Sequence, residues 1–205
     1  MGILHLHRED PHYPDSLLRC LGTRAPDTLS AIGNVELLKE ELLAVFCSIK
    51  CPGSVILQTY DVAQALRESG RSVISGFHSP IERECLTILL RGVNPIVVCL
   101  ARGIERMRIP KAYQKALEDD QLLLLSSFSD KICRADTTIT TTRNLVVAAL
   151  AHEVFVAHAE PGSRTSMLCD DVLKWGKSLL TVDNSSNSKL FALGAKPIRT
   201  LKGDD

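Results

Sequence analysis

Three turns of the chain combine small residues, hydroxyl groups and cations in a way that suits phosphate binding. They span residues 47–54, 75–80 and 160–166, and they read CSIKCPGS, SGFHSP and EPGSRTS. Between them they carry Lys50, His78 and Arg164. Backbone amides, hydroxyls and cationic side chains are the groups with which proteins hold phosphate oxygens. Each turn taken alone is also typical of a tight turn that caps a helix.

A further cation, Arg143, follows the threonine-rich segment 137–142. We expect a helix over residues 143–151, with the threonines as its cap and with Arg143 and Asn144 in its first turn. The dipole of a helix disfavours a cation at its N-terminus unless an anion is nearby. The pattern therefore predicts that both residues lie at the phosphate site.

The charge balance requires any such site to be local. The chain has 205 residues, with 24 Lys and Arg against 24 Asp and Glu, 45% hydrophobic residues and 4% aromatic residues. This composition is typical of a globular protein that can bury a core without a metal or a disulfide. A net charge of zero gives no general attraction to polyanions. A phosphate site must therefore be built from a few cations in one place.

The glycine spacing excludes the common nucleotide fingerprints. None of the 12 glycines stands two positions from another, so the chain has no G-x-G-x-x-G, and it has no G-x-x-x-x-G-K-[ST] either. His5 and His7 would share one face of a strand, but no acidic or cysteine partner lies at ligand spacing. We therefore expect no metal, no cofactor and no catalytic residue.

The cysteines and the absence of targeting signals point to a reducing compartment. Seven cysteines lie scattered, mostly in apolar runs, as reduced core cysteines do. Cys47 and Cys51 flank a helix start, where a thiol can be reactive, although packing is the more usual role. The sequence shows no secretory signal and no apolar run of membrane-spanning length. It predicts a cytoplasmic protein with no membrane partner.

Short apolar runs alternate with longer amphipathic stretches along most of the chain. The runs that predict strands are residues 43–49, 72–75, 95–100, 122–126, 154–157 and 179–182. The stretches that predict helices are residues 55–69, 81–91, 112–119, 143–151 and 167–175. Strands that are apolar on both faces and are separated by helices indicate a parallel sheet covered on both sides. The predicted fold is α/β, an open, doubly wound, mostly parallel and Rossmann-like sheet with helices on both faces.

Two segments make up the predicted domain organisation. Residues 1–42 form an N-terminal lead-in that packs on the core, and residues 43–205 form the Rossmann-like domain. In such sheets the ligand crevice lies beyond the carboxyl ends of the strands. All three turns follow strands, so the fold is expected to bring them to one edge.

Several motifs, in order along residues 13–198, resemble the DNA-processing protein A (DprA/Smf) family. They are Tyr13–Leu17, Leu43–Ser48, Ser75–Glu82, Arg143-Asn144, Ser186–Leu190 and Gly194–Ile198. The resemblance implies an extended Rossmann core that binds single-stranded DNA without an enzymatic reaction. It also implies a homodimer that loads a RecA-type recombinase during natural transformation.

The chain departs from the family pattern at the first two turns. Ile49 stands where the family's Gly-Ser-Arg motif has arginine, and only Lys50 could substitute for that cation. Pro80 replaces a glycine, and Glu82 replaces an aspartate. The missing arginine predicts a lowered affinity for DNA.

An enzymatic alternative arises from the third turn. Residues 161–169 resemble in part the Pro-Gly-Gly-x-Gly-Thr-x-x-Glu motif of phosphoribohydrolases that cleave nucleoside monophosphates. Cys169 stands in place of the glutamate, and a thiol cannot stabilise an oxocarbenium-like sugar as a carboxylate does. Asp170 is one position away, about 100° around a helix. A relative that binds no ligand and acts as a scaffold is the third alternative.

The predicted partner is thus single-stranded DNA or a nucleotide phosphate. The candidate contacts are Ser48, Lys50, Ser75, Gly76, His78, Arg143, Asn144, Ser163, Arg164 and Lys189.

Overall fold

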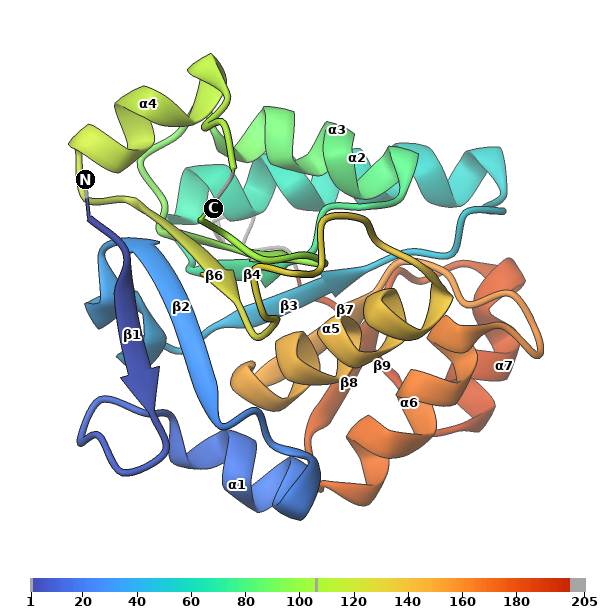
Figure 1. The fold of residues 1–205 in the computed structure, drawn as a ribbon. Coiled ribbons are helices and arrows are strands. Elements are labelled where there is room, and N and C mark those ends of the chain that lie inside the picture. The colour runs from blue at the N-terminus through green and yellow to red at the C-terminus, as the bar shows by residue number, and fades with distance from the viewer. Residues whose placement is uncertain (1, 106, 200–205) are drawn as a thin grey trace.

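The strands of the described residues form a single β-sheet. The computed structural model describes residues 2–105 and 107–199 (Figure 1). The strands are β1 (Leu4–His7), β2 (Thr28–Gly33), β3 (Leu43–Phe46), β4 (Val73–Ser75), β5 (Ile96–Leu100), β6 (Leu122–Ser126), β7 (Glu153–Val156), β8 (Ser178–Thr181) and β9 (Lys196–Pro197). The α-helices are α1 (Asp15–Leu21), α2 (Gly53–Ser69), α3 (Pro80–Leu89), α4 (Lys111–Glu118), α5 (Thr137–Leu150), α6 (Arg164–Lys174) and α7 (Ser188–Ala192). Short 3-10 helices span Gly22–Arg24, Val35–Lys39 and Ser185–Asn187.

The strand order shows where the sheet can form a ligand crevice. The strands lie in the order β1-β2-β6-β5-β4-β3-β7-β8-β9, and the pairs from β6 through β9 are parallel. The chain proceeds from β3 to β6 on one side and continues from β7 to β9 on the other. The direction of winding therefore reverses between β3 and β7. At such a switch point the loops after two adjacent strands diverge and leave a crevice.

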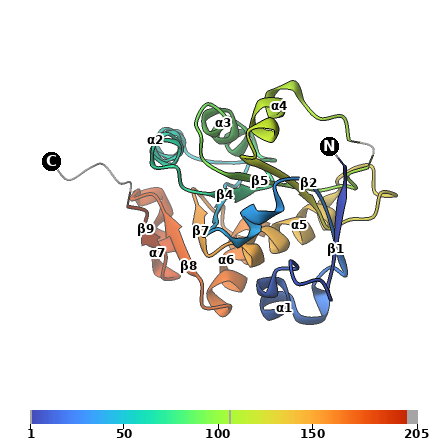
Figure 2. The same ribbon diagram turned by 90° about the vertical axis from the view of Figure 1, so that its left-hand side faces the viewer.

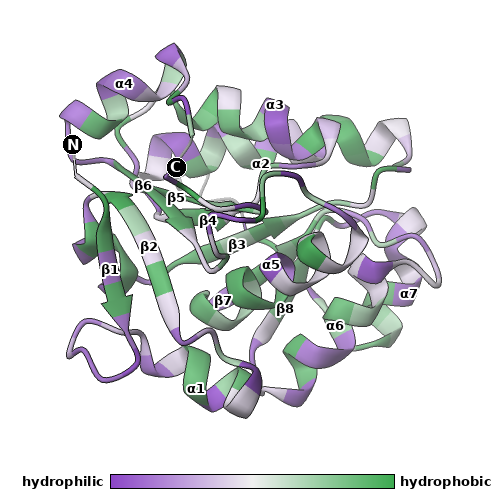
Figure 3. Ribbon diagram, in the orientation of Figure 1, coloured by the Kyte–Doolittle hydropathy of each residue, from purple (hydrophilic) through white to green (hydrophobic). Residues whose placement is uncertain are grey.

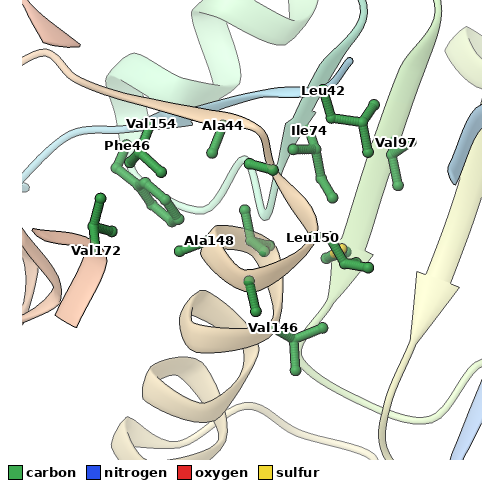
Figure 4. Packing of buried hydrophobic residues seen from close by; sticks show 14 of the residues in the cluster. Leu42, Ala44, Phe46, Ile74, Val97, Val146, Ala148, Leu150, Val154 and Val172 are labelled. Carbon is green, nitrogen blue, oxygen red and sulfur yellow. The ribbon is translucent and has the colours of Figure 1, made fainter. Parts of the chain in front are cut away.

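Helices cover both faces of the sheet, as predicted. Helices α2, α3 and α4 lie on one face, and α1, α5 and α6 lie on the other (Figures 1 and 2). Alternate residues of β3 belong to the two cores, because Leu43 and Val45 pack with the first group of helices while Ala44 and Phe46 pack with the second. Figure 4 shows Ala44 and Phe46 against Ala148 and other residues of α5. The α/β, doubly wound prediction is confirmed.

The hydropathy of the elements explains this layering. The central parallel strands are predominantly hydrophobic, whereas the outer helix α4 is predominantly hydrophilic (Figure 3). Helix α4 buries only Leu117, but α5 buries a continuous run from Val146 to Leu150. Within the described residues, no helix has the length and apolar character needed to cross a membrane.

The first 42 residues contribute two strands to the sheet. Strand β1 pairs antiparallel with β2, and β2 pairs antiparallel with β6. His5 and His7 lie on one face of β1, and their Nδ1 atoms are 3.0 Å from the hydroxyls of Ser30 and Thr28. Each histidine thus contacts its direct cross-strand partner. The division of the chain at residue 42 stays a prediction.

Helix α5 is longer than its apolar pattern indicates. Asp136 caps it by accepting a 2.8 Å hydrogen bond from the Ile139 amide, so the helix begins at Thr137. The hydroxyls of Thr140 and Thr141 donate to backbone carbonyls one turn earlier. The prediction that the threonines cap a helix beginning at Arg143 is therefore wrong. The carboxylate of Asp136 provides the cap, and the threonines lie inside the helix.

A lysine closes the opposite end of α5. The Nζ atom of Lys177 donates to the carbonyl oxygens of Ala148, Ala149 and Ala151 at 2.9, 2.6 and 2.5 Å. The last carbonyls of a helix have no partner within the helix, and they carry the negative end of its dipole. Lys177 therefore satisfies both the hydrogen bonds and the charge at this end.

Candidate functional site

A crevice lies at the carboxyl ends of β3 and β7, where the strand order reverses. Its cavity volume is about 290 Å³, and it is bordered by the loops after β3, β4 and β7 and by the first half of α5. Seven predicted contacts line it, namely Ser48, Lys50, His78, Arg143, Asn144, Ser163 and Arg164. Residues that are far apart in the sequence thus meet at this edge of the sheet.

Two serines join the loops that follow β3 and β7. The Ser48 hydroxyl accepts a hydrogen bond from the Glu160 amide at 3.1 Å and lies 3.3 Å from the Ser163 hydroxyl. Ser163 also caps α6 by accepting from the Ser166 amide at 3.2 Å. These contacts hold the two loops together and direct the N-terminus of α6 at the crevice.

A carboxylate occupies the other side of the crevice. Glu82 is 6% exposed, and its two oxygens accept from the amides of Cys47, His78 and Ser79 at 3.0, 2.8 and 3.2 Å. The Ser79 hydroxyl accepts in return from the Glu82 amide, which completes a capping box at the start of α3. Because Glu82 uses these amides, an incoming anion cannot bind them while the carboxylate stays in place.

Arg143 lies almost completely buried beside the crevice. It is 3% exposed, and its Nη1 donates to the carbonyl oxygen of Cys99 at 3.2 Å. Its Nε is buried without a hydrogen-bond partner among the described residues. Burial lowers the pKa of Arg143, while the nearby Glu82 carboxylate acts in the opposite direction. The crevice therefore contains a cation whose hydrogen-bonding capacity is only partly used.

The position of Arg143 differs from the predicted one. Since α5 begins at Thr137, Arg143 lies in the second turn of the helix and not in the first. The argument from the helix dipole therefore does not apply. Arg143 reaches the crevice because Gly76 leaves room for it: a Cβ atom on Gly76 would lie 1.0 Å from Nη1 of Arg143.

Two further cations are exposed at the rim. Lys50 lies in the loop after β3, and Arg164 begins α6, where its Nη1 donates to the carbonyl oxygen of Thr137 at 3.2 Å. The lining includes three permanent cations, Lys50, Arg143 and Arg164, against two carboxylates, Glu82 and Glu160. The crevice is thus slightly positive in a chain whose net charge is zero.

Three predicted contacts do not line the crevice. Ser75 is fully buried, because its hydroxyl donates to the Val45 carbonyl and accepts from the Phe77 amide. Gly76 lies beneath the Arg143 guanidinium. Lys189 is exposed on α7, outside the lining. The first two shape the site from below, and Lys189 lies apart from it.

Several lining residues are not among the predicted contacts. Glu82, Glu160, Thr140, Thr141 and Thr165 all border the crevice. The Ser79–Glu82 spacing is that of a capping box, so this signal was present for Glu82. Nothing in the local pattern distinguishes Glu160 from an ordinary exposed turn residue.

The two residues nearest to the carboxylate position of the enzymatic alternative, Cys169 and Asp170, lie outside the crevice. Cys169 is fully buried in α6, and its thiol donates to the Thr165 carbonyl at 3.2 Å. Asp170 is exposed, and neither residue lines the cavity. The position at which a phosphoribohydrolase has its carboxylate is therefore part of the core.

One family model matches most of the chain, and several solved structures share its fold. The model of the family described as DNA recombination-mediator protein A matches residues 5–201. No curated protein matches the chain. Among solved structures, DNA processing protein A (DprA) from Streptococcus pneumoniae is 22% identical with a TM-score of 0.79, and the alignment covers 97% of this chain and 71% of that one.

Two further structures show the same fold. DNA processing protein A from Helicobacter pylori, described for its single-stranded DNA binding mode, is 16% identical with a TM-score of 0.76, over 96% of this chain and 91% of that one. The molybdenum cofactor binding protein from Rippkaea orientalis is 12% identical with a TM-score of 0.53, over 75% and 83%. The first covers nearly the whole chain, and the second covers three quarters of it.

Proposed function

This chain belongs to the DNA recombination-mediator protein A family, and from that premise we propose that it binds single-stranded DNA in the crevice between β3 and β7. The observation that carries the proposal is Arg143, a buried cation beside an open crevice, whose Nε has no hydrogen-bond partner among the described residues. A buried charge without sufficient partners is costly. A phosphate oxygen entering the crevice would offset that cost.

The composition of the crevice favours contact with the DNA backbone. Lys50 and Arg164 stand at the rim, and Ser163 and Thr165 add hydroxyls near the start of α6. Among the described residues, the lining contains no Phe, Tyr or Trp, and the imidazole of His78 is the one ring in it on which a base could stack. Binding is therefore expected to depend weakly on sequence and strongly on salt. The Helicobacter pylori relative, described for its single-stranded DNA binding mode, supports the same ligand class.

The amides of Cys47, His78 and Ser79 are already used by Glu82. The phosphate is therefore expected on the side of Arg143 and α6.

The affinity of the crevice for DNA is expected to be modest, because its lining includes two carboxylates and the exposed, uncharged Ile49. Ile49 is 71% exposed at the rim, where the family motif has arginine.

A salt titration tests this function. A fluorescent single-stranded oligonucleotide is titrated with the full chain at several salt concentrations, and log affinity is plotted against log salt. With three or four phosphates contacted, the slope is expected to be about −2 to −3, since each phosphate on a single strand contributes about −0.7. An absence of binding at low salt would overturn the proposal and favour the scaffold alternative.

Two variants of one helix localise the contact. Arg164→Ala removes a rim cation at the start of α6 and should weaken binding and flatten the slope by about 0.7. Lys174→Ala removes an exposed cation at the other end of the same helix, about 15 Å away, and should leave both unchanged. Equal effects of the two variants would place the DNA elsewhere.

We propose further that the chain shares the roles that the family resemblance implies. These are DNA processing during natural transformation, loading of a RecA-type recombinase onto single-stranded DNA, and action as a cytoplasmic homodimer. Family membership supports these roles.

Light scattering at several protein concentrations tests whether the chain forms a dimer. Faster formation of recombinase filaments on coated DNA in the presence of this protein tests the loading step, and an unchanged rate would contradict it.

A further inference from the structure

A second, smaller cavity lies between α5 and α6, directly beside the crevice. Its volume is about 100 Å³, and the two helices that form it pack against each other (Figure 1). The residues that line this α5–α6 groove recur at the three- and four-residue spacing that places them on one face of each helix. They are Thr141, Asn144 and Leu145 of α5 and Arg164, Met167, Leu168 and Asp171 of α6.

The groove and the crevice are continuous. Thr141, Asn144 and Arg164 line both of them. Arg164 begins α6 and donates a hydrogen bond to the Thr137 carbonyl at the start of α5, so it bridges the two helices where the cavities meet. A DNA strand with a phosphate beside Arg164 in the crevice would therefore bring the adjoining sugar and base to the groove.

The chemistry of the groove differs from that of the crevice. Leu168 is 4% exposed, and Leu145 is partly buried against the same core. Among the described residues, the charged groups of the lining are one cation, Arg164, and one carboxylate, Asp171. The groove thus has no excess of positive charge with which to hold a second phosphate. Its apolar surface instead favours an uncharged, flat ring.

An exposed methionine at the groove supports this assignment. Met167 is 63% exposed, although it adjoins the buried Leu168. The thioether of methionine is polarisable and makes favourable contacts with aromatic rings. A ring placed in the groove would also remove apolar surface of Met167 from water, which is itself favourable.

We propose that the α5–α6 groove binds one nucleobase of the strand whose phosphate lies in the crevice; this inference rests on the proposed function. The base would lie against Met167 and Leu145. Its pairing edge can donate to the Asp171 carboxylate, while the Asn144 amide offers both a donor and an acceptor. Each of the four DNA bases carries an N–H group on its pairing edge, so the groove accepts any of them. The inferred contact therefore agrees with weak sequence dependence.

An abasic strand separates contacts to bases from contacts to phosphates. Two fluorescent oligonucleotides of equal length and charge are compared, one of natural single-stranded DNA and one built entirely of tetrahydrofuran abasic residues. The affinity of the full chain for each is measured by anisotropy at low salt. Met167→Ala should weaken binding of the natural strand about two- to tenfold, because a sulfur–ring contact is lost. The same variant should leave binding of the abasic strand unchanged.

Two further variants control for volume and position. Met167→Leu keeps an apolar side chain of similar volume and should retain most of the affinity for the natural strand. Leu57→Ala removes another exposed apolar side chain, which is 67% exposed on α2 and lies outside the groove. This variant should leave the affinity for both strands unchanged.

Two results would overturn the inference. An equal loss with both strands in Met167→Ala would show that Met167 does not act on a base, and an unchanged affinity for the natural strand would show that no base lies against it. In either case, salt-dependent binding of the abasic strand would still support the proposed function. If neither strand binds at low salt, the proposed function and this inference both fail.

Discussion

Arg143 and Lys177 are two cations held against the protein interior, and α5 links them. Lys177 Nζ donates three hydrogen bonds to carbonyls at the C-terminal end of this helix. Arg143, from the second turn of the same helix, makes one hydrogen bond to Cys99 and has a buried Nε without a partner among the described residues. Burial lowers the pKa of both groups.

The difference between the two shows how a structural cation is distinguished from one available to a ligand. Lys177 has an internal acceptor for each of its three N–H groups, so no donor of this ammonium group remains for a ligand. Arg143 borders a cavity and keeps unused donors. Removing Lys177 should therefore affect stability, and removing Arg143 should affect binding.

The largest effect is expected for Lys177→Met. Three carbonyls at the end of α5 lose their donor, so the free energy of unfolding should fall by about 2–4 kcal/mol. The affinity of the folded protein for DNA should not change. Urea unfolding followed by circular dichroism measures the first quantity. Lys174→Met, at the exposed end of α6, is the control, and an equal loss in that variant would contradict the assignment.

Arg143→Met should give the opposite pattern. Methionine fills a similar volume and removes the cost of burying a charge, which offsets the loss of one hydrogen bond to the Cys99 carbonyl, so the free energy of unfolding should change by no more than about 1 kcal/mol. The affinity for single-stranded DNA should fall about 10- to 100-fold, because a hydrogen bond to a charged group contributes about 1.5–3 kcal/mol. Fluorescence anisotropy and urea unfolding measure the two quantities. A large loss of stability with unchanged affinity would make Arg143 a structural residue like Lys177.

Gly76→Ala sharpens the comparison by moving Arg143 without removing it. The added Cβ would lie 1.0 Å from Nη1 and 1.7 Å from Cζ, so the guanidinium must shift. We expect a loss of about 1–3 kcal/mol in stability, as for other overpacked sites, together with weaker DNA binding. In the double variant Gly76→Ala/Arg143→Met the stability should recover, and affinity should be no lower than in Arg143→Met alone. Additive losses would show that Gly76 does not act through Arg143.

The smallest effect is expected for Ile49→Arg, which adds a third exposed cation at the rim. Affinity for DNA should rise several-fold at low salt, and the slope of log affinity against log salt should steepen by about 0.7. Leu57→Arg is the matched control, because Leu57 is also exposed, at 67%, but lies on α2 outside the crevice lining. An equal gain in both variants would indicate a general charge effect.

The periodic pattern predicted the elements of the parallel sheet well. Strand β6 was predicted with the bounds that the structure has, and α2 and α3 differ from their predicted bounds by one or two residues. Their apolar residues recur with the period of the element and face a core, so local pattern and tertiary packing agree. Helix α5 was placed six residues too late, because its first turns carry threonines without an apolar stripe.

The candidate site was predictable in part for the same reason. Residues that follow strands, such as Ser48 and Ser163, were predicted to meet because the carboxyl ends of parallel strands share one edge. Contacts between distant segments decide which cation is buried and which hydroxyl already bonds to the backbone. These two properties therefore cannot be predicted from the local sequence. Ser75 was therefore predicted as a contact although its hydroxyl is committed within the fold.

The sequence by itself determined the α/β fold, the family and the edge of the sheet at which the loops gather, because these depend on hydrophobic periodicity and the order of motifs. The tertiary structure alone decided how the charges are used. Glu82 accepts hydrogen bonds from amides of the first two turns, and Lys177 donates its hydrogen bonds to carbonyls at the end of α5. Arg143 retains a hydrogen-bond donor without a partner among the described residues. Such choices depend on which donors and acceptors meet in space, since most buried polar groups, but not the Nε of Arg143, find a partner there.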